Sequence, residues 1–379
     1  MKIAYVTAYD SANVRNWSGS GYYIRKALEA QGNEILPIGN LKFERTWFYY
    51  PKAAFYKYIV HKNYHVRREP LVLKRLGDQV NEKLKDEEYD LVFCPGTSPI
   101  SYLKKKKPIA LWLDSTFASA IDFYPYYSNL AKETIEKANA TTQLALDKAD
   151  LIMFNSQWGA DTTLANYNVN ASKIKVVPFG ANIEVNRTME DVKKVVLNKQ
   201  TNECNLLFVG VEWQRKGGDI AVKVAGELIK RGIPTTLHIV GVTPPAAVPD
   251  YCKVYGFISK HDENGRKFLE ELFTNAHFFL LPTRAEMCAV VYAESASFGL
   301  PVITTDVGGV STAIRNGKNG VMLPLDAAIS DYCDVIESYF RSPEEYQKFS
   351  ISSFEEYEKR MNWDVAGKTA NDLIYKLLD

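Results

Sequence analysis

The hydrophobic positions of this chain form two sets of short, uninterrupted apolar runs. The first set is KIAYVTAY, DLVFCPG, IALWLD and DLIMFNS, and the second is NLLFVGV, TTLHIVG, HFFLLPT and PVITTD. Segments with apolar residues at helical spacing separate the runs. Continuous runs of Val, Ile, Leu and Phe are typical of strands buried on both faces of a parallel sheet. Both halves of the chain are therefore predicted to be α/β.

A polar, weakly periodic segment that starts at a Pro-Phe-Gly turn separates the two sets. We therefore expect an N-terminal domain over residues 1–182 and a C-terminal domain over residues 183–355. Residues 356–379 have apolar positions at helical spacing, so we expect a helical tail that packs back toward the N-terminal domain. Because open α/β sheets bind ligands beyond the carboxyl ends of their strands, the cleft between the domains is the expected site.

Length and charge narrow the classes of protein. A chain of 379 residues is too long for one ordinary core. A formal net charge of +1 excludes binding of nucleic acid over the whole surface. No signal peptide and no apolar window of membrane-spanning length is present, so we expect a cytoplasmic protein. The five cysteines form no CxxC pair, which favours buried, reduced thiols.

A glycine pair, Gly19 and Gly21, lies in WSGSGYY, after the first apolar run and at the start of a predicted helix. A dinucleotide fingerprint fails here, because Ile24 occupies the third glycine position and the preceding loop is long. The phosphate-loop motif GxxxxGK[ST] is absent from the sequence. Two interpretations remain: a helix start whose N–H groups receive an anion, and a flexible turn without a ligand.

The second half of the chain also has glycines at the start of a predicted helix after an apolar run, and here basic residues precede them. Arg215 and Lys216 precede a Gly-Gly pair at a helix start, where a phosphate is favoured, although a solvated turn is the commoner case. Glu286 and Glu294 are separated by seven residues within PTRAEMCAVVYAESASFGLPVIT. A carboxylate in such apolar surroundings needs hydrogen-bond donors, and vicinal sugar hydroxyls are suitable ones. An ion pair or a helix cap is the alternative.

These segments resemble family 4 of the retaining glycosyltransferases, known as glycosyl transferases group 1. The resemblance rests on PTRAEMCAVVYAESASFGLPVIT, DVGGVSTAIRNGKNGVMLP and FVGVEWQRKGG, and it extends through most of the chain. It implies the GT-B fold, in which two Rossmann-like α/β domains face a central cleft. It also implies an enzyme that transfers a sugar from a UDP- or GDP-type donor to a hydroxyl acceptor, with retention of configuration, in polysaccharide or glycolipid biosynthesis.

By resemblance, Glu286 contacts the hydroxyls of the donor sugar, Glu294 binds the ribose, and Lys216 holds the diphosphate. We assign catalysis to Glu286, Lys216 and Asp114. We assign donor binding to a larger set that follows the family motifs: Gly19, Gly21, Arg215, Lys216, Glu286, Met287, Cys288, Ala289 and Glu294. No metal and no cofactor is expected. We expect bulky residues at Gly19 or Gly21 to impair donor use more than folding.

The chain departs from the family pattern at three places. Val211 replaces the usual arginine, and Arg215 is the candidate substitute. Asp114 replaces a histidine, and either acts on the acceptor or donor or only caps the next helix. Cys288 and Ala289 replace an aromatic-glycine pair. These departures keep two alternatives open, a catalytically impaired protein that binds sugar nucleotides and a GT-B epimerase.

Residues 42–75 combine nine Lys or Arg with nine aromatic residues and only two Glu. Such a mixture suits peripheral contact with a membrane or a lipid-linked acceptor. A pair of packed helices with basic side chains in water is the slightly preferred alternative. His61 and His65 share this segment, but the pattern for a zinc site is incomplete.

Overall fold

The computed structural model describes residues 1–184, 186–260 and 262–378, so Val185, His261 and Asp379 lie outside the described residues. Contacts within the chain divide it into two compact units. The first unit comprises Met1–Pro178 and Trp363–Asp379, and the second comprises Phe179–Asn362. The chain therefore enters the second unit once and returns to the first unit for its last helix.

The first unit contains a parallel sheet of six strands in the order β2-β1-β3-β4-β5-β6. The four inner strands are almost wholly buried, because helices cover both faces of the sheet. The strands are β1 (Lys2–Val6), β2 (Glu34–Ile38), β3 (Leu91–Cys94), β4 (Ile109–Leu113), β5 (Leu151–Phe154) and β6 (Ile174–Val176).

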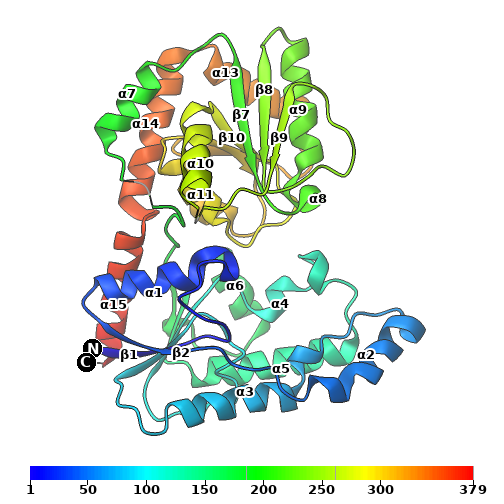
Figure 1. The fold of residues 1–379 in the computed structure, drawn as a ribbon, viewed down its shortest axis with the longest axis vertical. Coiled ribbons are helices and arrows are strands. Elements are labelled where there is room, and N and C mark those ends of the chain that lie inside the picture. The colour runs from blue at the N-terminus through cyan, green and yellow to red at the C-terminus, as the bar shows by residue number, and fades with distance from the viewer. Residues whose placement is uncertain (185, 261, 379) are drawn as a thin grey trace. The chain divides into compact units, whose positions relative to one another are not determined.

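Figure 1 shows α1 and α15 on one side of this sheet and α3 and α5 on the other. The main helices are α1 (Ser20–Ala30), α2 (Tyr50–Phe55), α3 (Pro70–Lys83), α4 (Phe117–Ala120), α5 (Lys132–Lys148), α6 (Gln157–Asn166) and α15 (Trp363–Leu378). Short 3-10 turns are η1 (Asn16–Gly19), η2 (Thr46–Tyr49), η4 (Val66–Arg68), η5 (Pro125–Tyr127) and η6 (Ala171–Lys173), and η3 (Tyr56–Val60) is a π-helical turn.

The second unit contains another parallel sheet of six strands, in the order β12-β11-β10-β7-β8-β9. Each pair of strands is joined through a segment that crosses a face of the sheet, as parallel pairing requires. The strands are β7 (Cys204–Val209), β8 (Thr235–Val240), β9 (Cys252–Gly256), β10 (Phe278–Leu281), β11 (Val302–Thr305) and β12 (Gly320–Leu323).

Helices of the second unit bury this sheet in one large apolar cluster. Among them, α13 packs on α9, and α14 packs on α7 and α11. The helices are α7 (Met189–Leu197), α8 (Trp213–Lys216), α9 (Gly218–Lys230), α10 (Glu263–Asn275), α11 (Val290–Ala296), α12 (Val310–Ala313), α13 (Ile329–Phe340) and α14 (Pro343–Arg360).

The predicted α/β class is confirmed, and all eight apolar runs are strands. The four strands outside those runs are β2, β6, β9 and β12, and these are the edges of the two sheets. Their residues are only partly buried. A strand that is not covered on both faces needs no continuous apolar run, so the pattern that identified the inner strands is missing from the edges.

The unit boundaries differ from the expected ones by a few residues. The chain leaves the first unit after Pro178, whereas the sequence analysis expected residue 182. It returns at Trp363 rather than at residue 356, because α14 runs on to Arg360 as part of the second unit. The polar segment expected at the boundary contains α7, whose start is fixed by a capping box between Thr188 and Asp191.

Candidate donor site

The order of strands in the second sheet changes direction between β7 and β10. Ligands of open α/β sheets bind at such a switch point, beyond the carboxyl ends of the strands. Arg215 and Lys216 lie in α8, which follows β7, and Glu286 lies in the loop that follows β10. Two segments that are 70 residues apart in the sequence are therefore neighbours at this point.

Lys216 and Glu286 form a buried ion pair at the switch point. The ammonium of Lys216 donates to Oε2 of Glu286, and the side chains are 9% and 6% exposed. Arg215 adds a second cation, with its Nη1 atom 3.4 Å from the same oxygen and 2.8 Å from the carbonyl of Ala285. Arg215 also pairs with Glu212. Two basic side chains and two carboxylates thus form one cluster.

The loop after β10 is fastened to the loop after β7. The backbone N–H of Arg284 donates to the carbonyl of Arg215 at 2.7 Å, and the hydroxyl of Thr283 donates to the same carbonyl at 3.1 Å. The guanidinium of Arg284 pairs with both carboxylate oxygens of Asp219 at 2.8 Å. These contacts fix the separation of Glu286 from the two basic side chains.

Glu294 is the fifth residue of α11 and is fully buried. The ammonium of Lys260 donates to its Oε1 atom. Its Oε2 atom is also buried and has no hydrogen-bond partner among the described residues. A buried carboxylate oxygen without a donor costs free energy, so this atom is suited to accept hydrogen bonds from a ligand.

Met287, Cys288 and Ala289 connect Glu286 to α11. Met287 is buried, and Cys288 and Ala289 are half-buried, with Ala289 at the N-cap of the helix. The neighbouring Gly-Gly turn contacts this segment, because the N–H of Gly309 donates to the carbonyl of Glu286 at 2.9 Å. Met287, Cys288 and Ala289 therefore directly adjoin the cluster of Glu286, Lys216 and Arg215.

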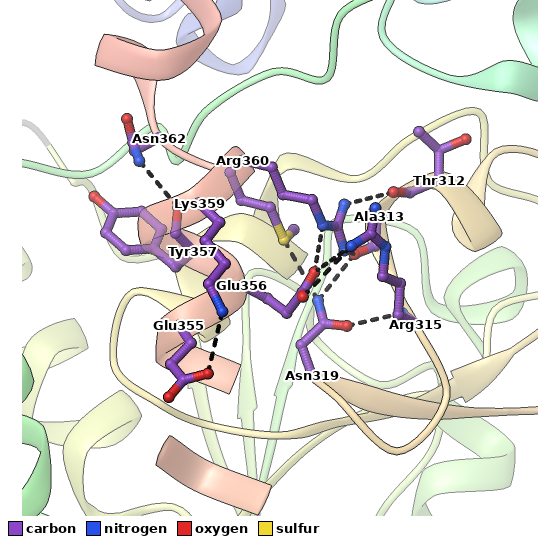
Figure 2. Close-up of polar contacts among 11 residues, drawn as sticks. Thr312, Ala313, Arg315, Asn319, Glu355, Glu356, Tyr357, Lys359, Arg360 and Asn362 are labelled. Carbon is purple, nitrogen blue, oxygen red and sulfur yellow. Dashed lines mark hydrogen bonds and ion pairs between the residues drawn. The ribbon is translucent and has the colours of Figure 1, made fainter. Parts of the chain in front are cut away.

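A polar network holds the helix that follows this Gly-Gly turn (Figure 2). Arg360, at the end of α14, donates 2.7 Å hydrogen bonds to the carbonyls of Thr312 and Ala313, the last residues of α12. Its Nε atom donates to Glu356 at 2.5 Å, and Asn319 donates to the carbonyl of Ala313 at 2.9 Å. The turn that contacts Glu286 is thus supported from the second unit's last helix.

In the first unit, the glycine loop lies beside Asp114. The indole N–H of Trp17 donates to Oδ2 of Asp114 at 3.3 Å. Trp17, Ser18 and Gly19 all have positive φ angles, of 47°, 54° and 89°. This conformation is unfavourable for residues other than glycine and often marks a functional loop. Burial raises the pKa of Asp114, and the hydrogen bonds from Ser115 and Trp17 oppose that rise.

Gly21 has a packing role that the sequence analysis did not expect. A Cβ atom on Gly21 would lie 2.2 Å from the hydroxyl of Tyr9. A side chain at Gly21 would require the ring of Tyr9 to move, so this glycine also has a part in packing. The Tyr9 hydroxyl is buried and has no hydrogen-bond partner among the residues that the structure describes.

The sequence profile of the family described as Glycosyl transferases group 1 matches residues 203–340. That range carries Arg215, Lys216, Glu286 and Glu294. Residues 203–340 are therefore similar to a domain of the group 1 glycosyltransferases. The family prediction is confirmed at this level, and the range is called the glycosyltransferase domain below.

The curated relatives of this chain are also named as glycosyltransferases. The D-inositol 3-phosphate glycosyltransferase of Gordonia bronchialis is 23% identical over 236 residues, which cover 59% of this chain and 51% of that protein. The protein of this name from Acidothermus cellulolyticus is 27% identical over 198 residues, 46% of this chain and 42% of its own. The chain thus spans about half the length of the curated relatives it matches.

Solved structures resemble the whole chain. The sucrose-phosphate synthase of Thermosynechococcus elongatus has a TM-score of 0.68 with 16% identity, over 100% of this chain and 99% of that one. HepE of Anabaena, solved in complex with UDP-glucose, has a TM-score of 0.65 with 14% identity, over 99% of this chain and 100% of its own. Together with the two parallel sheets, this similarity confirms the predicted GT-B fold of two Rossmann-like domains.

Sequence reasoning missed four residues that support the predicted ones. Lys260 pairs with Glu294, Arg284 pairs with Asp219, and Trp17 donates to Asp114. Arg284 lies within the recognised motif PTRAEMCAVVYAESASFGLPVIT, so its charge was a usable signal. Lys260 and Trp17 gave no such signal, since each is far from its partner in the sequence.

The described residues contain no group of three or more His, Cys, Asp or Glu side chains placed to hold a metal ion. Over the same part of the chain, no helix has both the length and the apolar character needed to cross a membrane.

Proposed function

We propose that this chain is a glycosyltransferase that moves a sugar from a nucleoside diphosphate sugar, of the UDP type, to a hydroxyl acceptor. The observation that carries the proposal is the buried cluster of Lys216, Arg215 and Glu286 at the switch point of the glycosyltransferase domain. The choice of uridine is supported by HepE of Anabaena, a protein of the same fold that was solved with UDP-glucose.

The ion pair explains how the site can exist without its donor. Two buried cations would be costly alone, and the carboxylates of Glu286 and Glu212 together neutralise them. A diphosphate that arrives at Lys216 and Arg215 replaces this carboxylate as their partner. Glu286 is then available to accept hydrogen bonds from the sugar hydroxyls. Donor binding thus gives the two cations a diphosphate as their partner and gives Glu286 hydroxyl donors in place of its ion pairs.

The same cations would assist the chemical step. When the bond between the anomeric carbon and the phosphate oxygen breaks, the electron pair goes to the diphosphate. Lys216 and Arg215 would stabilise the charge that develops there. Fixed charges in a site with little water can contribute several kcal/mol to such a step.

Glu294 would hold the ribose of the nucleotide. Lys260 occupies its Oε1 atom, so the free energy cost of the buried Oε2 atom is relieved when ribose hydroxyls donate to it. This assigns Glu286 to the sugar and Glu294 to the nucleotide.

Retention of configuration and independence of metals are parts of the proposal. The departing diphosphate would accept the proton of the acceptor hydroxyl on the face it leaves, and the two basic side chains would supply the charge that a metal supplies elsewhere. In the first unit, Gly19 would present backbone N–H groups to the donor phosphates. Asp114 would orient the acceptor hydroxyl, since its carboxylate is held by Trp17.

Binding of UDP to the purified full chain tests the assignment of the two glutamates. We expect Glu294→Gln to raise the Kd for UDP roughly 10- to 100-fold, because charge-assisted hydrogen bonds contribute about 1.5–3 kcal/mol. Glu286→Gln should not weaken UDP binding, because the diphosphate then has no carboxylate to displace from Lys216 and Arg215, and it should lower the turnover of UDP-sugars about 100-fold. Isothermal titration gives the Kd, and release of UDP gives the turnover.

The control is Glu263→Gln, a surface carboxylate that pairs with Lys267 in α10, and it should leave both values unchanged. Wild-type affinity for UDP in Glu294→Gln would contradict the assignment. A thermal-shift series with other nucleoside diphosphates tests the base, since a bound ligand stabilises the folded chain.

A binding protein without catalysis is the second candidate, and Val211 is the observation that favours it. This residue stands where the family usually has arginine, and its side chain is 64% exposed. Incubation with UDP-sugars discriminates between the candidates. Tight binding with no transfer and no hydrolysis of any nucleotide sugar would favour the binding protein, and an altered sugar on an intact nucleotide would indicate an epimerase.

A further inference from the structure

The segment from Thr46 to Val60 exposes an unusual number of large apolar side chains. Seven of them are between 41% and 68% exposed: Trp47, Phe48, Tyr50, Phe55, Tyr58, Ile59 and Val60. They lie on η2, α2 and η3, at the side of the first unit that is far from α15 in Figure 1. Contiguous apolar surface of this kind on a folded protein usually marks a site of contact with something else.

Two polar side chains of this segment face the protein. Lys52 and Tyr56 both contact Glu133 at the start of α5, the second at 3.3 Å. The hydrogen bonds from Lys137 and Lys52 lower the pKa of Glu133 to about 2, so the carboxylate is charged at neutral pH. These contacts attach the segment to α5. An ordinary surface helix turns its large apolar side chains toward the core, whereas this segment leaves seven of them exposed to solvent.

Part of the exposed set recurs at helical spacing, and residues 57–60 are all exposed, so the exposed surface widens at η3. Positions 47, 51, 55 and 58 are exposed, whereas positions 49, 52, 53 and 56 are partly buried. The outward face is defined here as Trp47, Phe48, Phe55, Tyr58 and Ile59. The outward face is an apolar strip on helical turns, and Lys52 and Tyr56 attach these turns to the unit through Glu133.

Basic residues surround the outward face without any acidic residue. Residues 45–68 contain six Lys or Arg and no Asp or Glu. Arg45, Lys57 and Lys62 are exposed among them. The ammonium of Lys57 lies over the ring of Tyr58, 5.2 Å from its centroid, so charge and aromatic surface adjoin.

We propose that the outward face and its basic residues bind the surface of an anionic lipid bilayer. Aromatic side chains prefer the boundary between headgroups and acyl chains, and apolar side chains of an interfacial helix are buried a few Å below it. Lys and Arg at the same level are attracted to anionic lipids. This binding goes beyond the proposed function, because it involves neither the donor nor the chemical step.

The charge distribution favours a bilayer over another copy of this chain. In a symmetric dimer the same patch would face itself, so the exposed Arg45, Lys57 and Lys62 would meet the same three residues of the second copy. A soluble polyanion would satisfy the basic residues but would leave Phe55 and Ile59 in water. The bilayer accommodates both features of the surface.

Co-sedimentation of the full chain with vesicles tests this proposal without a donor. We expect binding to vesicles of phosphatidylcholine mixed equally with phosphatidylglycerol, and weak or no binding to phosphatidylcholine alone. Binding should fall when salt is raised from roughly 0.1 M to 1 M, as the Debye length shortens.

The triple variant Trp47→Ser, Phe55→Ser, Ile59→Ser should bind at least about tenfold more weakly. The double variant Lys57→Gln, Lys62→Gln should bind roughly 30-fold more weakly.

Matched controls change equally exposed residues elsewhere. Phe257→Ser removes an apolar side chain that is 78% exposed in the second unit. Lys104→Gln with Lys106→Gln removes two exposed charges of the first unit. Both controls should bind anionic vesicles like the wild type, and unchanged circular dichroism should show that all variants are folded.

Three results would overturn the proposal. The first is absence of binding to anionic vesicles at low salt, and the second is equal binding by the wild type and both test variants. The third is a concentration-dependent dimer, seen by analytical ultracentrifugation, that the triple variant abolishes, because the outward face would then contact a second copy.

Discussion

At the scale of single residues, the glycines of the two predicted phosphate sites have packing roles of their own. A Cβ atom on Gly217 would lie 1.9 Å from the carbonyl oxygen of Pro282, and one on Gly218 would lie 2.4 Å from the ring of Trp213. Gly21 is similarly close to Tyr9. The glycines bring the loop after β7 against the loop after β10, and this approach places Lys216 beside Glu286.

Gly217→Ala should therefore destabilise the second unit by about 3 kcal/mol. The left-handed backbone, with φ at 76°, costs about 1 kcal/mol for alanine, and the overlap with Pro282 adds about 2 kcal/mol. Gly232→Ala is the matched control, since φ is 80° there and nothing lies within 4 Å of the added atom. It should cost only about 1 kcal/mol. Urea unfolding measures both, and equal losses would contradict the packing argument.

At the scale of elements, short helices near the site depend on their neighbours. The four residues of α12 are too few to form a stable helix in isolation. Its first turn follows Gly309, which contacts Glu286, and Arg360 binds its last carbonyls. The ion pair of Arg360 with Glu356 adds α14 to this support. The position of the Gly-Gly turn is thus set by a helix that is distant in the sequence.

Arg360→Met should destabilise the second unit by about 3 kcal/mol, because Glu356 loses its closest cation and two carbonyls of α12 lose their donor. The neighbouring variant Lys359→Met is the control. Lys359 is 67% exposed, and its ion pair among the described residues is with Glu355, at 3.3 Å, so the loss should stay within about 0.5 kcal/mol. Chemical denaturation compares the two variants. Similar losses would mean that the network does not stabilise α12.

At the scale of the whole molecule, the two units differ in their continuity. The second unit is one stretch of chain, whereas the first needs α15 from the far end. Trp363 stacks on Tyr23 with ring centroids 6.1 Å apart, and Asn371 accepts a 2.9 Å hydrogen bond from Asn33. A Cβ atom on Gly367 would lie 2.8 Å from the carbonyl oxygen of Ala27, so α15 and α1 are in close contact.

This difference predicts how fragments behave. Residues 179–362 should fold cooperatively alone, because their core is complete. Residues 1–178 alone should unfold at a lower temperature than the same residues joined to 363–379 by a flexible linker, since the face of α1 that contacts α15 would be exposed. Thermal melts by circular dichroism compare the three chains. Equal melting of the last two would show that α15 adds no stability to the first unit.

The sequence alone determined much of the fold and part of the site. Continuous apolar runs identified the eight inner strands, because burial on both faces requires them, and the motif around Glu286 and Glu294 identified the family. The four edge strands lie outside those runs, because partial burial leaves no continuous apolar stretch, and α7 lies in a segment that the sequence analysis took for a polar, weakly periodic connection. Tertiary structure decided the pairings: Lys216 with Glu286, Lys260 with Glu294, and Trp17 with Asp114. These depend on which strands are neighbours in a sheet, and no local pattern encodes that order. The same holds for the return of α15 and for the outward face, since burial of a side chain is settled only when the chain around it is packed.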